Sequence, residues 1–89
     1  ENANIKIKEL TSKLKNYKNI FFKIEQISLD KKLGWQIKLN DSNCIFLPLK
    51  KLDILIDIFD DIYKSDLYKK FDYFDFRVLG RVYMSNEKC

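Results

Sequence analysis

The feature that most constrains the fold is a strict alternation of apolar and polar residues from Trp35 to Asn40. In an extended chain the apolar members face one side and the polar members face the other, as in a strand with one buried face. The apolar members are Trp35, Ile37 and Leu39. Polar stretches that favour turns lie on both sides, at 30–34 and 40–43. We therefore expect a strand here, bounded by two turns.

The runs beyond these turns also have β character. Residues 20–29 are rich in β-branched and aromatic side chains, and their alternation changes phase near Gln26, which predicts a strand with a bulge or a bend. Residues 44–47 predict a short strand that ends at Pro48, because proline cannot donate a ladder hydrogen bond. The sequence thus predicts three consecutive strands, the first two joined by a hairpin.

Two amphipathic helices are expected on either side of these strands, because apolar residues recur there at steps of three and four. The first, with Asn4 as its N-cap, has a stripe of Ile7, Leu10, Leu14, Tyr17 and Phe21. The second has a stripe of Leu52, Leu55, Ile56, Phe59, Ile62 and Tyr63. Residues 64–70 are expected to connect the second helix to the final segment.

The final segment is extended again. It alternates Phe74, Phe76 and Val78 with Tyr73, Asp75 and Arg77, and after Gly80 it alternates Val82 and Met84 with Arg81 and Tyr83. A last strand of this kind is expected at a sheet edge, where another chain could add a strand to it. The alternative is a strand that is already paired within the fold and capped by the polar tail.

The predicted fold is therefore α+β. Its order is helix-strand-strand-strand-helix-strand(s), with an antiparallel or mixed sheet and helices packed on one face. We expect a single domain over residues 1–89, cut from a longer protein, because the chain begins at Glu1 and ends in a polar stretch.

Candidate catalytic residues are few. The chain has no histidine and only two glycines, so it offers no imidazole base, phosphate-binding loop or dinucleotide fingerprint. Asp72 and Asp75 are three apart and would project to opposite faces of a strand. The aspartates of the second helix are interpreted as a solvated face rather than a cation site. We expect no enzymatic activity, no cofactor and no metal.

Charge leaves an alternative function open. The chain carries 17 basic and 13 acidic residues, and a basic domain could bind nucleic acid. Residues 1–51 contain eleven lysines against five acidic residues, whereas residues 52–89 contain six basic and eight acidic residues. The excess lies mostly on the first helix and nearby turns, where solvated lysine is the ordinary interpretation. A small ribosomal or similar nucleic-acid-binding domain remains the alternative, and an inhibitor that binds through the acidic second helix is a third possibility.

The cysteines and one ion pair complete the candidates. Cys44 and Cys89 could pair only if the tail folded back onto the strand that holds Cys44, and two unpaired thiols are expected. Asp75 and Arg77 are two residues apart and so share one strand face. They are interpreted either as a pair that positions the last strand or as a polar anchor beside a binding edge.

Several of these segments, in this order, resemble the C-terminal extracytoplasmic domain of the bacterial cell-division family FtsQ/DivIB. The likeness runs from about Phe22 to Met84 and is greatest to alphaproteobacterial members. It rests on a strand that begins with tryptophan at 34–39, a strand that ends in Leu-Pro at 45–48, an amphipathic helix, and the closing segment 71–83. The family usually has Leu where Phe76 stands.

The resemblance implies a non-enzymatic division protein at the periplasmic face of the inner membrane, anchored by an N-terminal segment and located at the septum. Its partners would be FtsB/FtsL-like division proteins, bound by addition of a strand at the closing strand. Carried over to this chain, the partner-binding residues are Val78, Gly80, Arg81, Val82, Tyr83 and Met84, with Asp75 and Arg77 as the motif pair.

Overall fold

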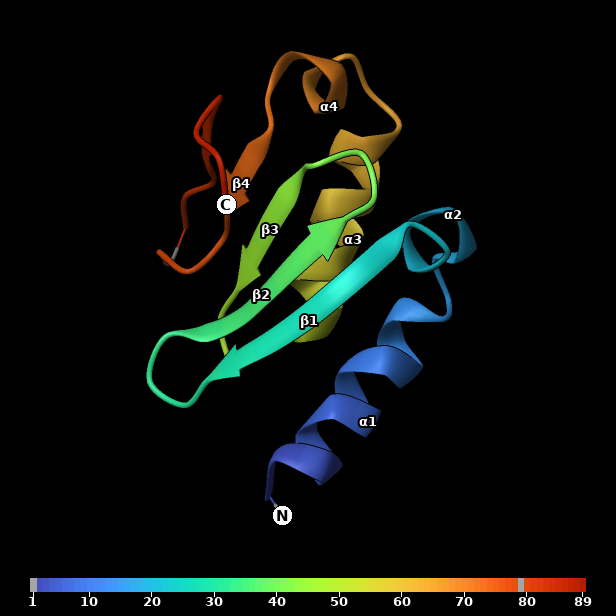
Figure 1. Cartoon of the computed structure of the whole chain (residues 1–89), viewed down its shortest axis with the longest axis vertical. Coiled ribbons are helices and arrows are strands. Elements are labelled where there is room, and N and C mark those ends of the chain that lie inside the picture. Colours follow the sequence, from blue (N-terminus) through green and yellow to red (C-terminus); the bar gives the residue numbers. More distant parts are fainter. Residues whose placement is uncertain (1, 79) are drawn as a thin grey trace.

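The computed structural model describes residues 2–78 and 80–89, with side chains from Ile5 onward. Figure 1 shows the order of the elements. The helices are α1 (Asn2–Leu14), α2 (Lys18–Phe21), α3 (Leu52–Tyr63) and α4 (Leu67–Lys70). The strands are β1 (Ile24–Asp30), β2 (Gly34–Leu39), β3 (Cys44–Leu47), β4 (Tyr73–Asp75) and β5 (Tyr83–Ser85).

The strands form one sheet in the order β1-β2-β3-β4-β5. Neighbouring strands are antiparallel, except that β3 and β4 run parallel. A parallel pair needs a long connection between its strands, and here α3 and α4 supply it. The predicted α+β class with a mixed sheet is confirmed.

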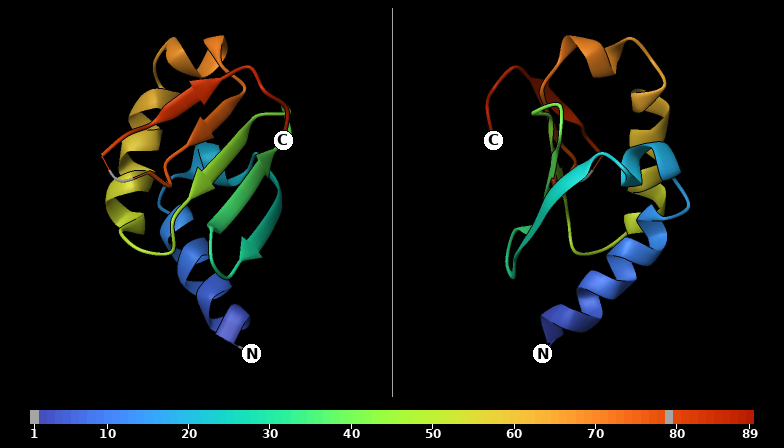
Figure 2. Two further views of the ribbon diagram at one scale, coloured as in Figure 1. Left: turned by 90° about the vertical axis from the view of Figure 1, so that its left-hand side faces the viewer. Right: turned by 45° about the vertical axis from the view of Figure 1, so that its right-hand side comes forward.

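The helices cover one face of the sheet and leave the other face open (Figure 2). We call the uncovered side the open face. The core lies between the sheet and the helices, and the alternation at 35–39 explains why: Trp35, Ile37 and Leu39 are all buried, whereas the residues between them are only half-buried. Leu10 and Leu14 of α1 and Ile56 and Phe59 of α3 complete the core from the helix side.

The two predicted turns form as expected. The Asp30 carboxylate accepts hydrogen bonds from the N–H groups of Lys32 and Leu33 at 2.8 and 3.0 Å, which closes the β1–β2 hairpin. Gly34 follows with φ of +110°, and a Cβ at this position would overlap the carbonyl oxygen of Leu47 on β3. The irregularity expected near Gln26 is also present, because the β1–β2 register shifts between Ile24 and Gln26.

Two local predictions are wrong. Residues 20–23 were expected to extend the first strand, but they belong to α2 and the turn after it, because the N–H groups of Ile20 and Phe21 bond to the Tyr17 carbonyl. Asn4 cannot be the N-cap, since α1 already begins at Asn2. Residues 64–70 connect α3 to the final segment as expected, and they contain a helical turn, α4, whose Tyr68 is buried against the core.

Candidate partner-binding edge

The end of the chain forms a short hairpin at one edge of the sheet. β5 is the terminal strand in the sheet order, and β4 is its only neighbour in the described part of the chain. β1 forms the opposite edge. The prediction that the last strand lies at a sheet edge is therefore confirmed, and so is its pairing within the fold on one side.

The hydrogen-bond pattern indicates which backbone groups of β5 face outward. Just before β4, the Asp72 carbonyl accepts from the Cys44 N–H on β3, while the Asp72 N–H donates to the Ser85 carbonyl on β5; just after β4, the Phe76 N–H donates to the Phe46 carbonyl on β3. Because successive residues in a strand direct their backbone groups to opposite sides, the first and last residues of β4 face their register partners, the first and last residues of β5. The N–H and C=O of Met84 then point to the free edge, and Val82 lies one residue before the strand.

The side chains of this segment alternate as expected. Val82 and Met84 are half-buried and pack against the core, whereas Arg81 and Tyr83 are exposed. The Tyr83 hydroxyl donates a 2.7 Å hydrogen bond to Glu87. Val78 was expected to share a buried face with Phe74 and Phe76, but it lies beyond the end of β4 and is 59% exposed. In this segment, Phe76 is therefore the last side chain of the series that faces the core.

Asp75 and Arg77 form a two-pronged ion pair at the end of β4. The guanidinium Nε and Nη2 donate to the two carboxylate oxygens at 2.9 and 2.8 Å, and the Arg77 backbone N–H donates to Asp75 Oδ1 at 2.9 Å. Burial alone would raise the pKa of the Asp75 carboxyl, but these hydrogen bonds outweigh burial and lower that pKa. The guanidinium also lies 4.5 Å from the ring centre of Phe46 on the open face.

The pair fixes the direction in which the chain leaves β4. From there the segment made of residues 76–78 and 80–82 lines one wall of an apolar groove of about 460 Å³. Four of the predicted partner-binding residues line it: Val78, Gly80, Arg81 and Val82. Gly80 has φ of +76° and turns the segment back toward β5. Tyr83, Met84 and Asp75 do not line the groove.

The other wall of the groove was not found from the sequence. It comes from residues before α3 and from α3 itself: Pro48, Lys50, Lys51, Leu55 and Ile58. Ile58, which is 38% exposed, lies outside the apolar stripe of its helix. An isoleucine on the polar side of an amphipathic helix was the available signal. The groove is thus apolar inside, with Lys50, Lys51 and Arg81 among its lining residues.

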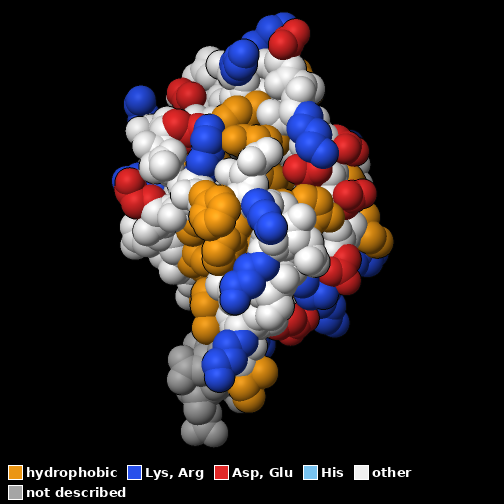
Figure 3. Space-filling model, turned by 90° about the vertical axis from the view of Figure 1, so that its right-hand side faces the viewer, with side chains coloured by type: hydrophobic (Ala, Val, Ile, Leu, Met, Phe, Trp, Pro, Cys, Tyr) orange, Lys and Arg blue, Asp and Glu red, His pale blue; other side chains and the backbone are white. Residues whose placement is uncertain are grey.

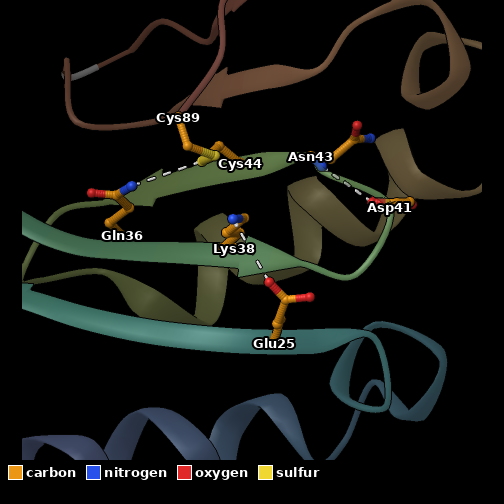
Figure 4. Close-up of a disulfide and its surroundings, with 7 residues drawn as sticks. All are labelled: Glu25, Gln36, Lys38, Asp41, Asn43, Cys44 and Cys89. Carbon is orange, nitrogen blue, oxygen red and sulfur yellow. Dashed lines mark hydrogen bonds and ion pairs between the residues drawn. A yellow bond between two sulfur atoms is a disulfide. The ribbon is translucent and has the colours of Figure 1, made fainter.

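The cysteines are joined, so the prediction of two unpaired thiols is wrong. Cys89 in the tail after β5 is disulfide-bonded to Cys44 on β3, with their Cα atoms 5.7 Å apart. Figure 4 shows the tail reaching the sulfur of Cys44 on the open face, where the Gln36 amide is 3.8 Å from that sulfur. The tail does fold back onto β3, which is the condition that the sequence could not test.

Other kinds of site find little support in the described residues. Between residues 2 and 89, with residue 79 left out, no group of three potential metal ligands gathers, and no helix is long and apolar enough to cross a membrane. On the helix-bearing side, basic and acidic side chains are interspersed with hydrophobic ones (Figure 3). This mixture of positive and negative charge does not favour the binding of a polyanion such as RNA or DNA on that side.

Fold and edge together define a small α+β domain whose sheet ends in an open strand beside an apolar groove. A family model for the C-terminal part of the cell division protein FtsQ/DivIB matches residues 2–77. The chain belongs to the FtsQ/DivIB family, a family of non-enzymatic scaffold proteins in cell division. No curated protein and no solved structure matches it.

The match differs in extent from the resemblance seen in the sequence. It includes α1, which was left out, and it ends at Arg77, before β5. The motif pair Asp75 and Arg77 therefore lies inside the matched region. The residues carried over as the partner site, 78 and 80–84, lie outside it, so their role is a proposal that depends on the edge geometry.

Proposed function

We propose that this chain is the periplasmic scaffold domain of a septal division protein, anchored to the inner membrane by a segment outside residues 1–89. It would bind FtsB/FtsL-like division partners by strand addition at β5 and have no enzymatic activity. The observation that carries the proposal is the edge position of β5, with the backbone groups of Met84 directed outward.

Two further features support strand addition at this edge. Side chains of an added strand would alternate between the two faces of the sheet, and those on the helix side would lie next to the apolar groove. The basic residues Lys50, Lys51 and Arg81 at that groove favour a partner strand that carries acidic residues among apolar ones. The Cys44–Cys89 disulfide is in keeping with an oxidising compartment such as the periplasm.

The first test is calorimetric titration with a peptide from the periplasmic part of FtsB of the same organism, at low and moderate salt. We expect saturable binding that persists at moderate salt, since main-chain hydrogen bonds carry it. Val82→Pro removes a backbone donor directly before β5, where an added strand would pair, and should abolish binding. The matched control is Ile27→Pro on the opposite edge strand, whose side chain is also half-buried against the core.

The control decides how the result is interpreted. If Ile27→Pro weakens binding as much as Val82→Pro, the β5 edge is not the site. If the peptide does not bind and RNA or DNA binds with strongly salt-dependent affinity, the domain is a nucleic-acid-binding module instead.

Tyr83 is expected to anchor the partner. Its ring is 53% exposed on β5, and aromatic side chains contribute heavily to interfaces. Tyr83→Ala should weaken peptide binding roughly tenfold and change the free energy of unfolding by less than about 0.5 kcal/mol. Phe22→Ala is the matched control, because Phe22 is 76% exposed and lies before β1 at the opposite edge. Equal affinities for the two variants would remove Tyr83 from the site.

A further inference from the structure

The tail after β5 crosses the open face of the sheet and is bonded to β3. We infer that the Cys44–Cys89 disulfide is a latch that holds the edge strand β5 in the conformation that accepts a partner strand. The inference rests on the proposed function, because it concerns the same edge. What it adds is control of that edge by a covalent bond. Hydrogen exchange without a partner tests the latch, and peptide titration tests the proposed function.

β5 has little else to hold it. It contains three residues with three register partners on β4, whereas β1 at the opposite edge contains seven residues. Beyond this ladder, Met84 packs against the core from the helix side, the Tyr83 ring is 53% exposed and lies edge-on to Tyr73, and the Ser85 carbonyl accepts from the Asp72 N–H. Short terminal strands with few buried contacts open locally at low cost in free energy. Without a further restraint, β5 would be the first strand to leave the sheet.

The disulfide supplies this restraint in the right place. Cys44 on β3 is the register partner of Tyr73 on β4, and Tyr73 is the register partner of Ser85 on β5. These three residues form one row across three strands. The bond therefore connects the two ends of this row through residues 86–89. Cys44 is fully buried, so the anchor of the latch is itself held in the sheet.

The tail also contacts the strand that it restrains. The Tyr83 hydroxyl donates to the Glu87 carboxylate, and the Glu87 N–H donates to Ser85 Oγ at 3.2 Å. The tail lies on the side of the sheet away from the helices (Figure 2), and the bond leads it inward to β3 instead of along β5. The latch thus orders β5 and leaves its outer edge free for a partner.

The latch can be opened chemically. A dithiol reductant would transfer two electrons and two protons to the disulfide, breaking the Sγ–Sγ bond to give two thiols while the reductant closes to its own disulfide. The partner strand would then have to order β5 as well as bind it, and the entropy of ordering lowers affinity. Recognition at this edge should therefore be stronger in the oxidised protein than in the reduced protein.

Amide hydrogen exchange measured by NMR tests the latch without any partner. In Cys89→Ser, the amides of Tyr83 and Ser85 should exchange at close to the rate of an unfolded chain, while the amides of Ile37 and Ile45 stay protected. A second variant inserts Gly-Ser-Gly-Ser between Lys88 and Cys89. The bond still forms, and the cross-linked loop lengthens little, so global stability is kept while the latch slackens.

The slack variant keeps the inference testable even if Cys89→Ser does not fold. We expect roughly tenfold faster exchange at Tyr83 and Ser85 in this variant, with Ile45 unchanged. Unchanged exchange at Tyr83 and Ser85 would overturn the latch, and so would an equal change at Ile45, since the bond would then act on the fold as a whole.

Titration with the FtsB peptide completes the test. Roughly tenfold weaker binding to the slack variant than to the wild-type protein is the expected result. Equal binding to both, with β5 shown to be released, would overturn the role of the latch in recognition. If β5 is released but neither form binds the peptide, the strand-addition function fails, while the latch stands as a structural device.

Discussion

At the scale of single residues, the Asp75–Arg77 pair joins the family region to the proposed site. Its three hydrogen bonds lie at the end of β4, where the residues that line the groove begin. The sequence left two roles open for the pair, namely positioning the last strand or contacting a partner. Because both side chains are largely sheltered and bonded to each other, the geometry favours the positioning role.

The pair makes a prediction about pH. The folded-state pKa of Asp75 lies below its unfolded value of about 3.9, so its ionised form stabilises the fold above about pH 4. This contribution should be lost as the pH falls from about 4 through the lowered folded-state pKa. In urea unfolding, Asp75→Asn should be less stable at pH 7 by about 1 kcal/mol and lose less stability below pH 4.

Asp61→Asn is the control for this measurement, because it removes one exposed carboxylate from α3. Its stability should follow the wild-type pH profile. If Asp75→Asn also follows that profile at every pH, the pair does not stabilise the folded state.

At the scale of elements, the docking of α1 on α3 builds the helix layer. Leu10 and Leu14 are buried in the core, and Lys13 bonds to Asp53 across the two helices at 2.7 Å. The ion pair is exposed on the Asp53 side and contributes little by itself. Apolar burial therefore accounts for most of the attachment of α1 to the domain.

The contribution of this attachment to stability can be measured with two substitutions in α1. Leu10→Ala should lower the free energy of unfolding by about 3 kcal/mol, because it leaves a cavity in a side-chain site that is 0% exposed. Ile5→Ala in the same helix changes a side chain that is 68% exposed and should cost less than about 0.5 kcal/mol. Chemical denaturation of both variants measures the difference. Equal losses would mean that α1 is not part of the folded core.

The elements also show what sequence patterns can and cannot predict. The strand at 34–39 was predictable because its alternation leaves one consistent burial pattern. The segment 20–23 misled because β-branched and aromatic residues have only a weak preference for strands, and here the Tyr17 carbonyl starts a helical turn. The groove was missed because its walls, near Ile58 and Val82, are far apart in sequence.

At the scale of the whole molecule, the chain is closed by a contact that no local pattern reveals. Cys44 and Cys89 are 45 residues apart, and their meeting depends on the strand order and on the path of the tail. The sequence could state the condition for pairing, which is a tail folded onto the strand of Cys44. Only the three-dimensional path could satisfy it.

The disulfide that this path allows should affect the stability of the whole fold. The bond encloses about half of the chain, so in the chain-entropy description it should stabilise the fold by about 4 kcal/mol through restriction of the unfolded state. We expect the double variant Cys44→Ser/Cys89→Ser to lose an amount of this order in urea unfolding. Adding reductant should bring the wild-type protein to the same stability and leave the double variant unchanged. If reductant does not change the wild-type transition, the two cysteines are not joined in solution.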